Sequence, residues 1–113
     1  MRLALLGAIA AAALAVPVAN AAGNSIVLGS PSPTVASGVF FKVTTSGNRD
    51  FDEIGVVCDN GYSTRITVAL DTRGAGTSGI VHPPAGSCTA TLEIPKSIGR
   101  VHVLASVDFT VAP

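Results

Sequence analysis

Hydrophobic and polar residues alternate one by one along most of the chain after residue 23, which is the pattern of a strand with one buried face. The clearest example is RVHVLASVDFTV, residues 100–111. One face of this segment carries Val101, Val103, Ala105, Val107, Phe109 and Val111. The opposite face carries His102, Ser106, Asp108 and Thr110. Helical spacing of apolar residues is absent after residue 23, so the pattern predicts an all-β protein.

The same alternation is interrupted by turn residues about every ten positions, which predicts seven strands. The expected strands are residues 24–30, 38–46, 53–59, 62–71, 77–82, 87–94 and 100–111. The segment Asp59-Asn60-Gly61 predicts a tight hairpin, because Asn and Gly tolerate the positive φ angles of such turns. Pro31 and Pro33 interrupt the first strand and mark it as an edge. Seven short antiparallel strands in about 90 residues are typical of an immunoglobulin-like β-sandwich.

The first 21 residues have the three parts of a secretory signal peptide. Arg2 supplies a positive charge, an apolar run extends from Leu3 to Val16, and Ala19 and Ala21 provide small residues for cleavage. The run is shorter than the roughly 20 residues of a membrane-spanning helix. We therefore expect a signal peptide over 1–21, one sandwich domain over 22–113, secretion, and no membrane span after cleavage. Arginine outnumbers lysine five to two, and Ala, Val and Gly are abundant, which suggests a bacterial source.

The charge of the expected domain excludes one class of partner. The chain has seven basic and seven acidic side chains, and loss of Arg2 with the leader leaves a net charge of −1. Such a surface does not attract nucleic acid or anionic membranes over a distance. We therefore expect no nucleic-acid partner.

The two cysteines both fall on the buried face of their strands. Cys58 shares its face with Ile54 and Val56, and Cys88 shares its face with Ala90 and Leu92. In an exported chain this arrangement predicts a Cys58–Cys88 disulfide. The loop that it closes corresponds to a stabilisation of roughly 3–4 kcal/mol.

The sequence gives less support to metal binding by the two cysteines. A zinc site formed with His82 and His102 would lack the short Cys-x-x-Cys or His-x-x-x-His spacing of such sites.

In the immunoglobulin strand order, a disulfide between the third and sixth strands joins neighbours within one sheet instead of bridging the two sheets.

The loop NRDFDE gathers Asn48, Asp50, Asp52 and Glu53. Oxygen ligands at alternate positions can hold calcium, although Glu53 stands where an EF-hand loop needs glycine. Both a solvated acidic loop and a calcium site are compatible with this pattern, and the solvated loop is the interpretation we favour.

A catalytic group is not indicated by the sequence. His102, Ser106 and Asp108 are neighbours on the outward face of the last strand, where polar residues are expected without catalysis. No Gly-x-Ser-x-Gly segment frames a serine. We expect neither enzymatic activity nor a cofactor.

Three apolar residues fall on the solvent side of their strands: Phe40, Val57 and Leu104. Single exposed apolar residues are ordinary. A contiguous patch would mark a partner or ligand surface, and Val57 and Leu104 are expected on the same sheet. These three residues form our candidate interaction surface.

Two resemblances add to this interpretation. The segments SPSPTVASGVFFKV, IGVVCDNG, CTATLEI and VLASVDFTV resemble small exported bacterial domains of the immunoglobulin or fibronectin type III kind, over most of residues 25–112. This resemblance implies fold and secretion. The chain has no tryptophan, whereas antibody domains carry one between their cysteines.

The segments GVFFKV, EIGVVC, DTRGAGTSG and CTATL are also similar to the neocarzinostatin family, whose members hold a reactive enediyne chromophore in a cleft. Those proteins usually have two disulfides, so no binding residue is carried over to this chain. We expect an exported non-enzymatic module that binds an unknown partner. The alternative is a carrier of a small molecule, held by loops such as 47–52 and 72–78.

Overall fold

The computed structural model describes residues 23–96 and 100–113, and only the backbone of residues 95, 96, 100 and 101. This part of the chain contains seven strands and no helix, which confirms the all-β prediction. The strands are β1 (Ser25–Leu28), β2 (Phe41–Thr44), β3 (Phe51–Cys58), β4 (Ser63–Ala69), β5 (Ala75–Thr77), β6 (Gly86–Lys96) and β7 (Arg100–Val111). The predicted signal peptide, residues 1–21, lies outside the described residues. Within the described part, no helix could cross a membrane.

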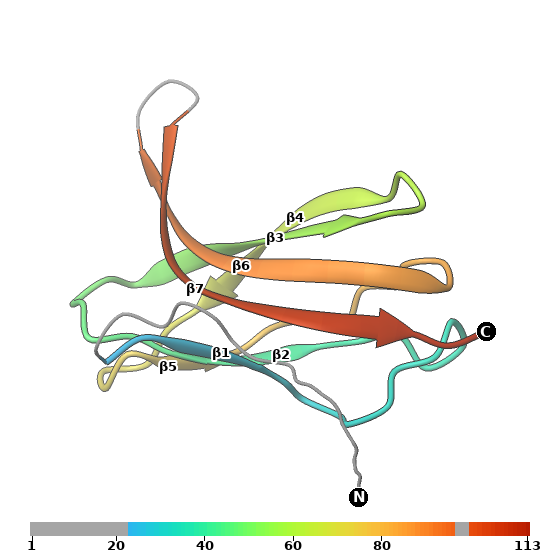
Figure 1. Ribbon diagram of the computed structural model, residues 1–113. Coiled ribbons are helices and arrows are strands. Elements are labelled where there is room, and N and C mark those ends of the chain that lie inside the picture. Colours follow the sequence, from blue (N-terminus) through green and yellow to red (C-terminus); the bar gives the residue numbers. More distant parts are fainter. Residues whose placement is uncertain (1–22, 97–99) are drawn as a thin grey trace, which may run out of the picture.

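The strands form two antiparallel sheets that face each other, as a sandwich does (Figure 1). The three-stranded sheet has the order β1-β2-β5 and the four-stranded sheet has the order β4-β3-β6-β7. The side chains between the two sheets form the core. Phe41 of β2 meets Phe109 of β7 edge to face, with ring centroids 5.6 Å apart, so the two sheets are in direct aromatic contact.

The predicted faces of the central strands are confirmed. Ile54, Val56 and Cys58 of β3 are buried, as are Ala90 and Leu92 of β6. The alternation of buried and exposed side chains is less complete along the neighbouring strand β4. On its core-facing side Val68 is buried. Ile66 in the strand, and Tyr62 and Leu70 just outside its ends, are only partly buried.

The fifth strand lies earlier than predicted. We expected residues 77–82, whereas β5 covers Ala75–Thr77 and the chain then leaves the ladder. Val81 keeps contact with the same sheet through an isolated antiparallel bridge to Val39. The side chain of Ser78 interrupts the ladder by accepting a hydrogen bond from the backbone N–H of Phe41. A hydroxyl that competes for a backbone donor in this way gives no hydrophobic signal in the sequence.

The outward position predicted for Leu104 is wrong. Leu92 pairs with Ala105 and Glu93 pairs with Val103, so Leu104 is an extra residue in β7. This β-bulge shifts the alternation by one position. Leu104 is therefore buried, at 7% exposed, and Val103 is 49% exposed, although we expected the opposite.

The predicted disulfide is present and joins neighbouring strands of one sheet. Cys58 of β3 and Cys88 of β6 are opposite residues in the ladder, and their Cα atoms are 4.0 Å apart. The backbone hydrogen bond from Asp59 to Ser87 follows directly, so the two cysteines occupy a non-hydrogen-bonded pair. Both cysteines are buried.

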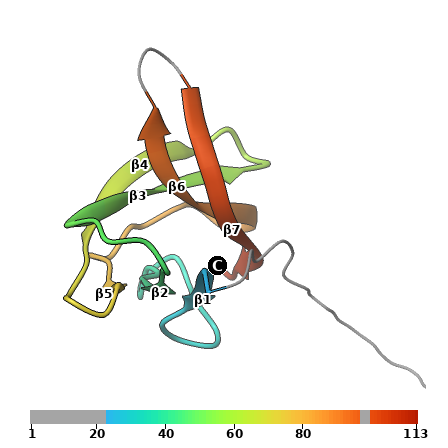
Figure 2. The same cartoon turned by 90° about the vertical axis from the view of Figure 1, so that its left-hand side faces the viewer.

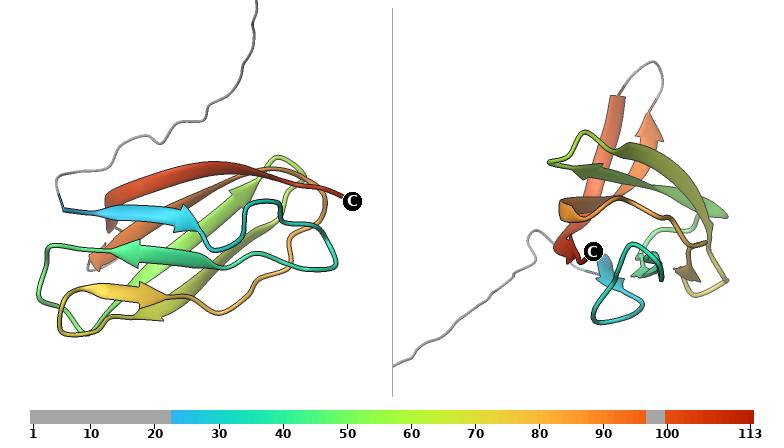
Figure 3. Two further views of the ribbon diagram at one scale, coloured as in Figure 1. Left: turned by 90° about the horizontal axis from the view of Figure 1, so that it is seen from below. Right: turned by 90° about the vertical axis from the view of Figure 1, so that its right-hand side faces the viewer.

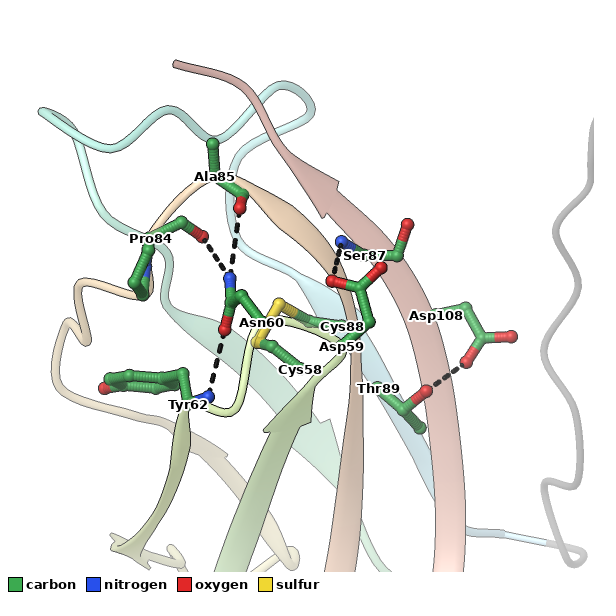
Figure 4. Close-up of a disulfide and its surroundings, with 10 residues drawn as sticks. All are labelled: Cys58, Asp59, Asn60, Tyr62, Pro84, Ala85, Ser87, Cys88, Thr89 and Asp108. Atoms are coloured by element: carbon green, nitrogen blue, oxygen red, sulfur yellow. Dashed lines mark hydrogen bonds between the residues drawn. A yellow bond between two sulfur atoms is a disulfide. The ribbon is translucent and has the colours of Figure 1, made fainter.

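The predicted hairpin turn holds a second segment against the disulfide (Figure 4). Asn60 donates hydrogen bonds from Nδ2 to the carbonyls of Pro84 and Ala85, and its Oδ1 accepts from the Tyr62 N–H. Gly61 has φ of +92°, which a residue with a side chain rarely adopts. The turn between β3 and β4 and the segment before β6 are thus one hydrogen-bonded unit.

Removal of the disulfide should lower stability substantially. In a variant with both Cys58→Ala and Cys88→Ala, we expect the free energy of unfolding to fall by about 3 kcal/mol, because the unfolded chain regains the freedom of the closed loop. Urea denaturation of the two proteins measures this difference. Reduction of the native protein should produce a similar fall. A loss below about 1 kcal/mol in both experiments would contradict the assignment of the bond as the main constraint on the unfolded chain.

Candidate functional site

The surface of the four-stranded sheet that points away from the core is the candidate site, and we call it the outer face. The strand registers arrange its residues in three rows that run across β4, β3, β6 and β7. The first row is Ser63, Val57, Thr89 and Asp108. The second row is Arg65, Gly55, Thr91 and Ser106. The third row is Thr67, Glu53, Glu93 and Val103.

The outer face is curved because of the bulge in β7. Beyond it, the β6–β7 hairpin bends away from the three-stranded sheet and rises on the side of the outer face (Figures 1 and 2). The view from the right-hand side shows the same rise of the hairpin (Figure 3). The three rows therefore lie on a concave sheet surface flanked by the hairpin.

An ion-pair cluster occupies the centre of the outer face. Glu53 and Glu93 are opposite each other on β3 and β6, an arrangement that is repulsive for two carboxylates. Arg65 offsets this repulsion, because its Nη1 donates to Glu93 Oε1 and lies 3.7 Å from Glu53 Oε1. The Thr91 hydroxyl donates to the other oxygen of Glu93. Glu93 is buried and satisfied on both oxygens, whereas the Arg65 side chain is half exposed.

Gly55 makes this cluster possible. Arg65 lies on β4 and Glu93 on β6, so their ion pair must cross β3, and it does so above Gly55. A Cβ atom at position 55 would lie 2.9 Å from Glu93 Oε2 and 3.3 Å from Thr91 Oγ1. This role of Gly55 was not among the predictions from the sequence. A glycine in the interior of a strand was the available signal, since it marks a close approach.

The side chains of the acidic loop, residues 48–53, differ in burial and in direction. Arg49 forms a bidentate pair with Asp52, with Nε–Oδ1 at 2.6 Å and Nη2–Oδ2 at 2.8 Å. The hydrogen bonds that Arg49 donates to Asp52 raise the pKa of Arg49 above its ordinary value; burial opposes this change, and the attraction between the two charges adds to it. Asp52 is fully buried and points to the core side, whereas Glu53 points to the outer face. The expectation of a solvated loop is therefore wrong for Asp52, and the four oxygen-bearing residues do not converge.

A shallow hollow lies beside this ion pair. It measures about 440 Å³ and is lined by Asn48, Arg49, Asp50, Phe51 and Ile94. Phe51 is exposed and Ile94 is half-buried, so the hollow has apolar walls next to a charged rim. It occurs at the 47–52 loop, one of the two loops that we expected to hold a small molecule.

The three residues of the candidate interaction surface are not brought together. Val57 is 61% exposed on the outer face, as predicted. Leu104 is in the core. Phe40 is half-buried, because its ring covers Gly29 in the segment between β1 and β2. Of the exposed apolar residues, Val103 is on the outer face with Val57, and Phe51 extends that face by one further position along β3.

The other candidate groups are also separated. The cysteine sulfurs are bonded to each other, and His82 Nδ1 lies 3.4 Å from the carbonyl of Val35, so the four residues of the zinc hypothesis are not a ligand set. The bulge in β7 pairs His102 with Ile94, so the prediction that His102 shares a face with Ser106 and Asp108 is wrong. Asp108 accepts a hydrogen bond from Thr89 Oγ1 at 2.7 Å. Within residues 23–96 and 100–113, no group of three acidic, histidine or cysteine residues is placed to hold a metal ion.

Comparison of the chain with known protein families, with curated proteins and with solved structures finds no match.

Gly55 provides a direct test of the ion-pair cluster. We expect Gly55→Ala to lower the free energy of unfolding by about 1–3 kcal/mol, because the added methyl group displaces the Glu93 carboxylate and leaves it buried with weakened partners. This decrease in the free energy of unfolding should be smaller than for a fully buried ion pair, since solvent partly screens the charge of Arg65. The matched control is Gly79→Ala, where a Cβ meets no atom within 4 Å. Equal urea midpoints for the two variants would contradict the role of Gly55.

Proposed function

We propose that this protein is an exported immunoglobulin-like module that acts outside the cell or at the cell envelope by binding another protein, without catalysis. The observation that carries the proposal is the outer face. Exposed apolar side chains, including Val57 and Val103, are set there among ion-paired and hydroxyl-bearing residues. Apolar contacts surrounded by polar groups are the usual composition of a protein–protein interface.

The strand order supports the immunoglobulin-like part of the proposal. In that fold the second strand pairs with the first and the fifth, and the third strand pairs with the sixth, which pairs with the seventh. The sheets β1-β2-β5 and β3-β6-β7 have this order. The fourth strand lies beside the third, as the additional strand of variable-type domains does.

Export is supported by two independent features. The first 21 residues have the pattern of a signal peptide, and a disulfide such as Cys58–Cys88 is typical of an oxidising compartment.

The rigidity of the outer face is also favourable for binding. Glu93 is already held by Arg65 and Thr91, so the centre of the outer face loses little freedom when a partner docks.

Paired substitutions on opposite sheets test the binding face. Val57 is on the outer face and Val27 is on the exposed side of the three-stranded sheet, and they are 61% and 50% exposed. The tagged protein is expressed in the cells that produce it and cross-linked in the culture, and the adducts are identified by mass spectrometry. We expect one defined adduct with a different protein for the native chain and for Val27→Glu, and its loss with Val57→Glu, because a buried unpaired carboxylate is costly. An adduct with a different protein that survives Val57→Glu would refute the outer face as the binding site.

The hollow at Phe51 and Ile94 favours a second candidate function, transport of a small apolar molecule, as in the neocarzinostatin family. A native mass spectrum of the unreduced protein from culture supernatant distinguishes the two. A carrier should show additional mass that leaves on denaturation and that decreases with Phe51→Ser but not with Val57→Ser. A bare mass for residues 22–113, two hydrogens below the reduced value, would reject the carrier and support export with the disulfide formed.

A further inference from the structure

Among the residues that the structure describes, 23–96 and 100–113, the outer edge of β4 has no strand paired with it. β4 is the last strand of the four-stranded sheet, and within this part of the chain it pairs with β3 alone. The backbone N–H of Cys58 donates to the Tyr62 carbonyl, and the backbone N–H of Leu70 donates to the Asp50 carbonyl. These two bonds show that the backbone N–H and C=O groups of the even-numbered residues of β4 point toward β3. The backbone N–H and C=O groups of Ser63, Arg65 and Thr67 therefore point away from the sheet, as a row of donors and acceptors.

The other edges are protected. β7 carries the bulge at Leu104, and near its end Ala112 exchanges backbone hydrogen bonds with Pro33 and Val35. β1 is short and is followed by Pro31 and Pro33, and β5 has three residues. Bulges, prolines and short strands are the usual devices that prevent edge pairing. β4 has none of them over residues 63–69 and is rich in β-branched side chains.

The core-facing side of β4 is also incompletely covered. Ile66 and Tyr62 are only partly buried. The three-stranded sheet reaches β4 near Ala69, whose carbonyl lies against Gly76 of β5. Because β5 is so short, it covers one end of β4 only, and Ile66 keeps an open flank.

We propose that β4 pairs with β4 of a second copy of this chain, antiparallel, with the two-fold axis at Ile66. In this register Ile66 faces the partner's Ile66, Thr64 faces the partner's Val68, and Tyr62 faces the partner's Leu70. The partly buried apolar side chains thus cover one another across the axis. Self-complementarity of this kind is the requirement for a two-fold interface, and it favours a second copy over an unrelated strand.

The charges select the same register. With the axis at Ile66, Arg65 lies opposite the partner's Thr67, and these two residues exchange the backbone hydrogen bonds. A register with the axis at Arg65 would instead place two guanidinium groups opposite each other, which is unfavourable. The proposed pairing forms one continuous eight-stranded sheet and leaves both outer faces open. It is independent of the binding function proposed above.

Cysteine cross-linking tests the register. Ile66 would be a non-hydrogen-bonded pair on the axis, where Cα atoms lie about 4.5 Å apart, within the range for a disulfide. We expect Ile66→Cys to form a covalent dimer under mild oxidation with the Cys58–Cys88 bond intact. Thr64→Cys is the matched control, because its partner is Val68 and the two introduced cysteines would be several residues apart. Equal cross-linking of both variants, or of neither, would overturn the proposed pairing.

A charge change at Thr67 separates association from folding. Within one chain Thr67 is opposite Glu53, so Thr67→Lys should stabilise the monomer and Thr67→Glu should destabilise it. Across the axis Thr67 is opposite Arg65, so Thr67→Lys should raise the dissociation constant about tenfold and Thr67→Glu should lower it. Sedimentation equilibrium measures the dissociation constant of the dimer, and urea denaturation measures the free energy of unfolding. A native protein that stays monomeric at about 1 mM, or dissociation constants that follow monomer stability, would refute the dimer.

Discussion

The pairing of β3 with β6 is the interaction on which the rest of this small sandwich depends. β3 lies between β4 and β6 and contributes buried residues to the core on one side and the centre of the outer face on the other. The core contains no tryptophan, and a domain of this size hides a limited share of its surface, so the covalent bond between Cys58 and Cys88 adds what packing alone does not supply. The turn at Asn60 and the segment before β6 are attached to the same point.

The outer face illustrates how a strand can be specialised on its two sides. On the core side, β3 alternates apolar residues without interruption from Ile54 to Cys58. On the other side, it places a carboxylate, a glycine and a valine at Glu53, Gly55 and Val57. The missing side chain at Gly55 lets an arginine from one neighbouring strand reach a glutamate on the other. A buried, fully bonded carboxylate in such a cluster holds the surface in one conformation.

Much of this architecture could be predicted from the alternation of apolar and polar residues. The central strands, the hairpin at Asn60 and the buried cysteines each follow from a local pattern within one or two elements, whereas the fifth strand was predicted too late in the chain. The position of Leu104 could not, because a bulge is defined by how many residues the partner strand contributes, and that number is not encoded in β7 itself. The burial of Asp52 was missed for a similar reason. It depends on the bidentate contact with Arg49, which forms only when the turn before β3 closes.

The position of the disulfide also has a consequence for how the chain reaches its native state. The two cysteines are opposite each other in the ladder, on the same face of the sheet. If β6 slipped by one residue along β3 during folding, its side chains would exchange faces and the two sulfurs would lie on opposite sides of the sheet. A chain held in that slipped alignment cannot close the bond, and a closed bond excludes that alignment. The disulfide therefore fixes the face that β6 turns to the core relative to β3, as well as restricting the unfolded chain.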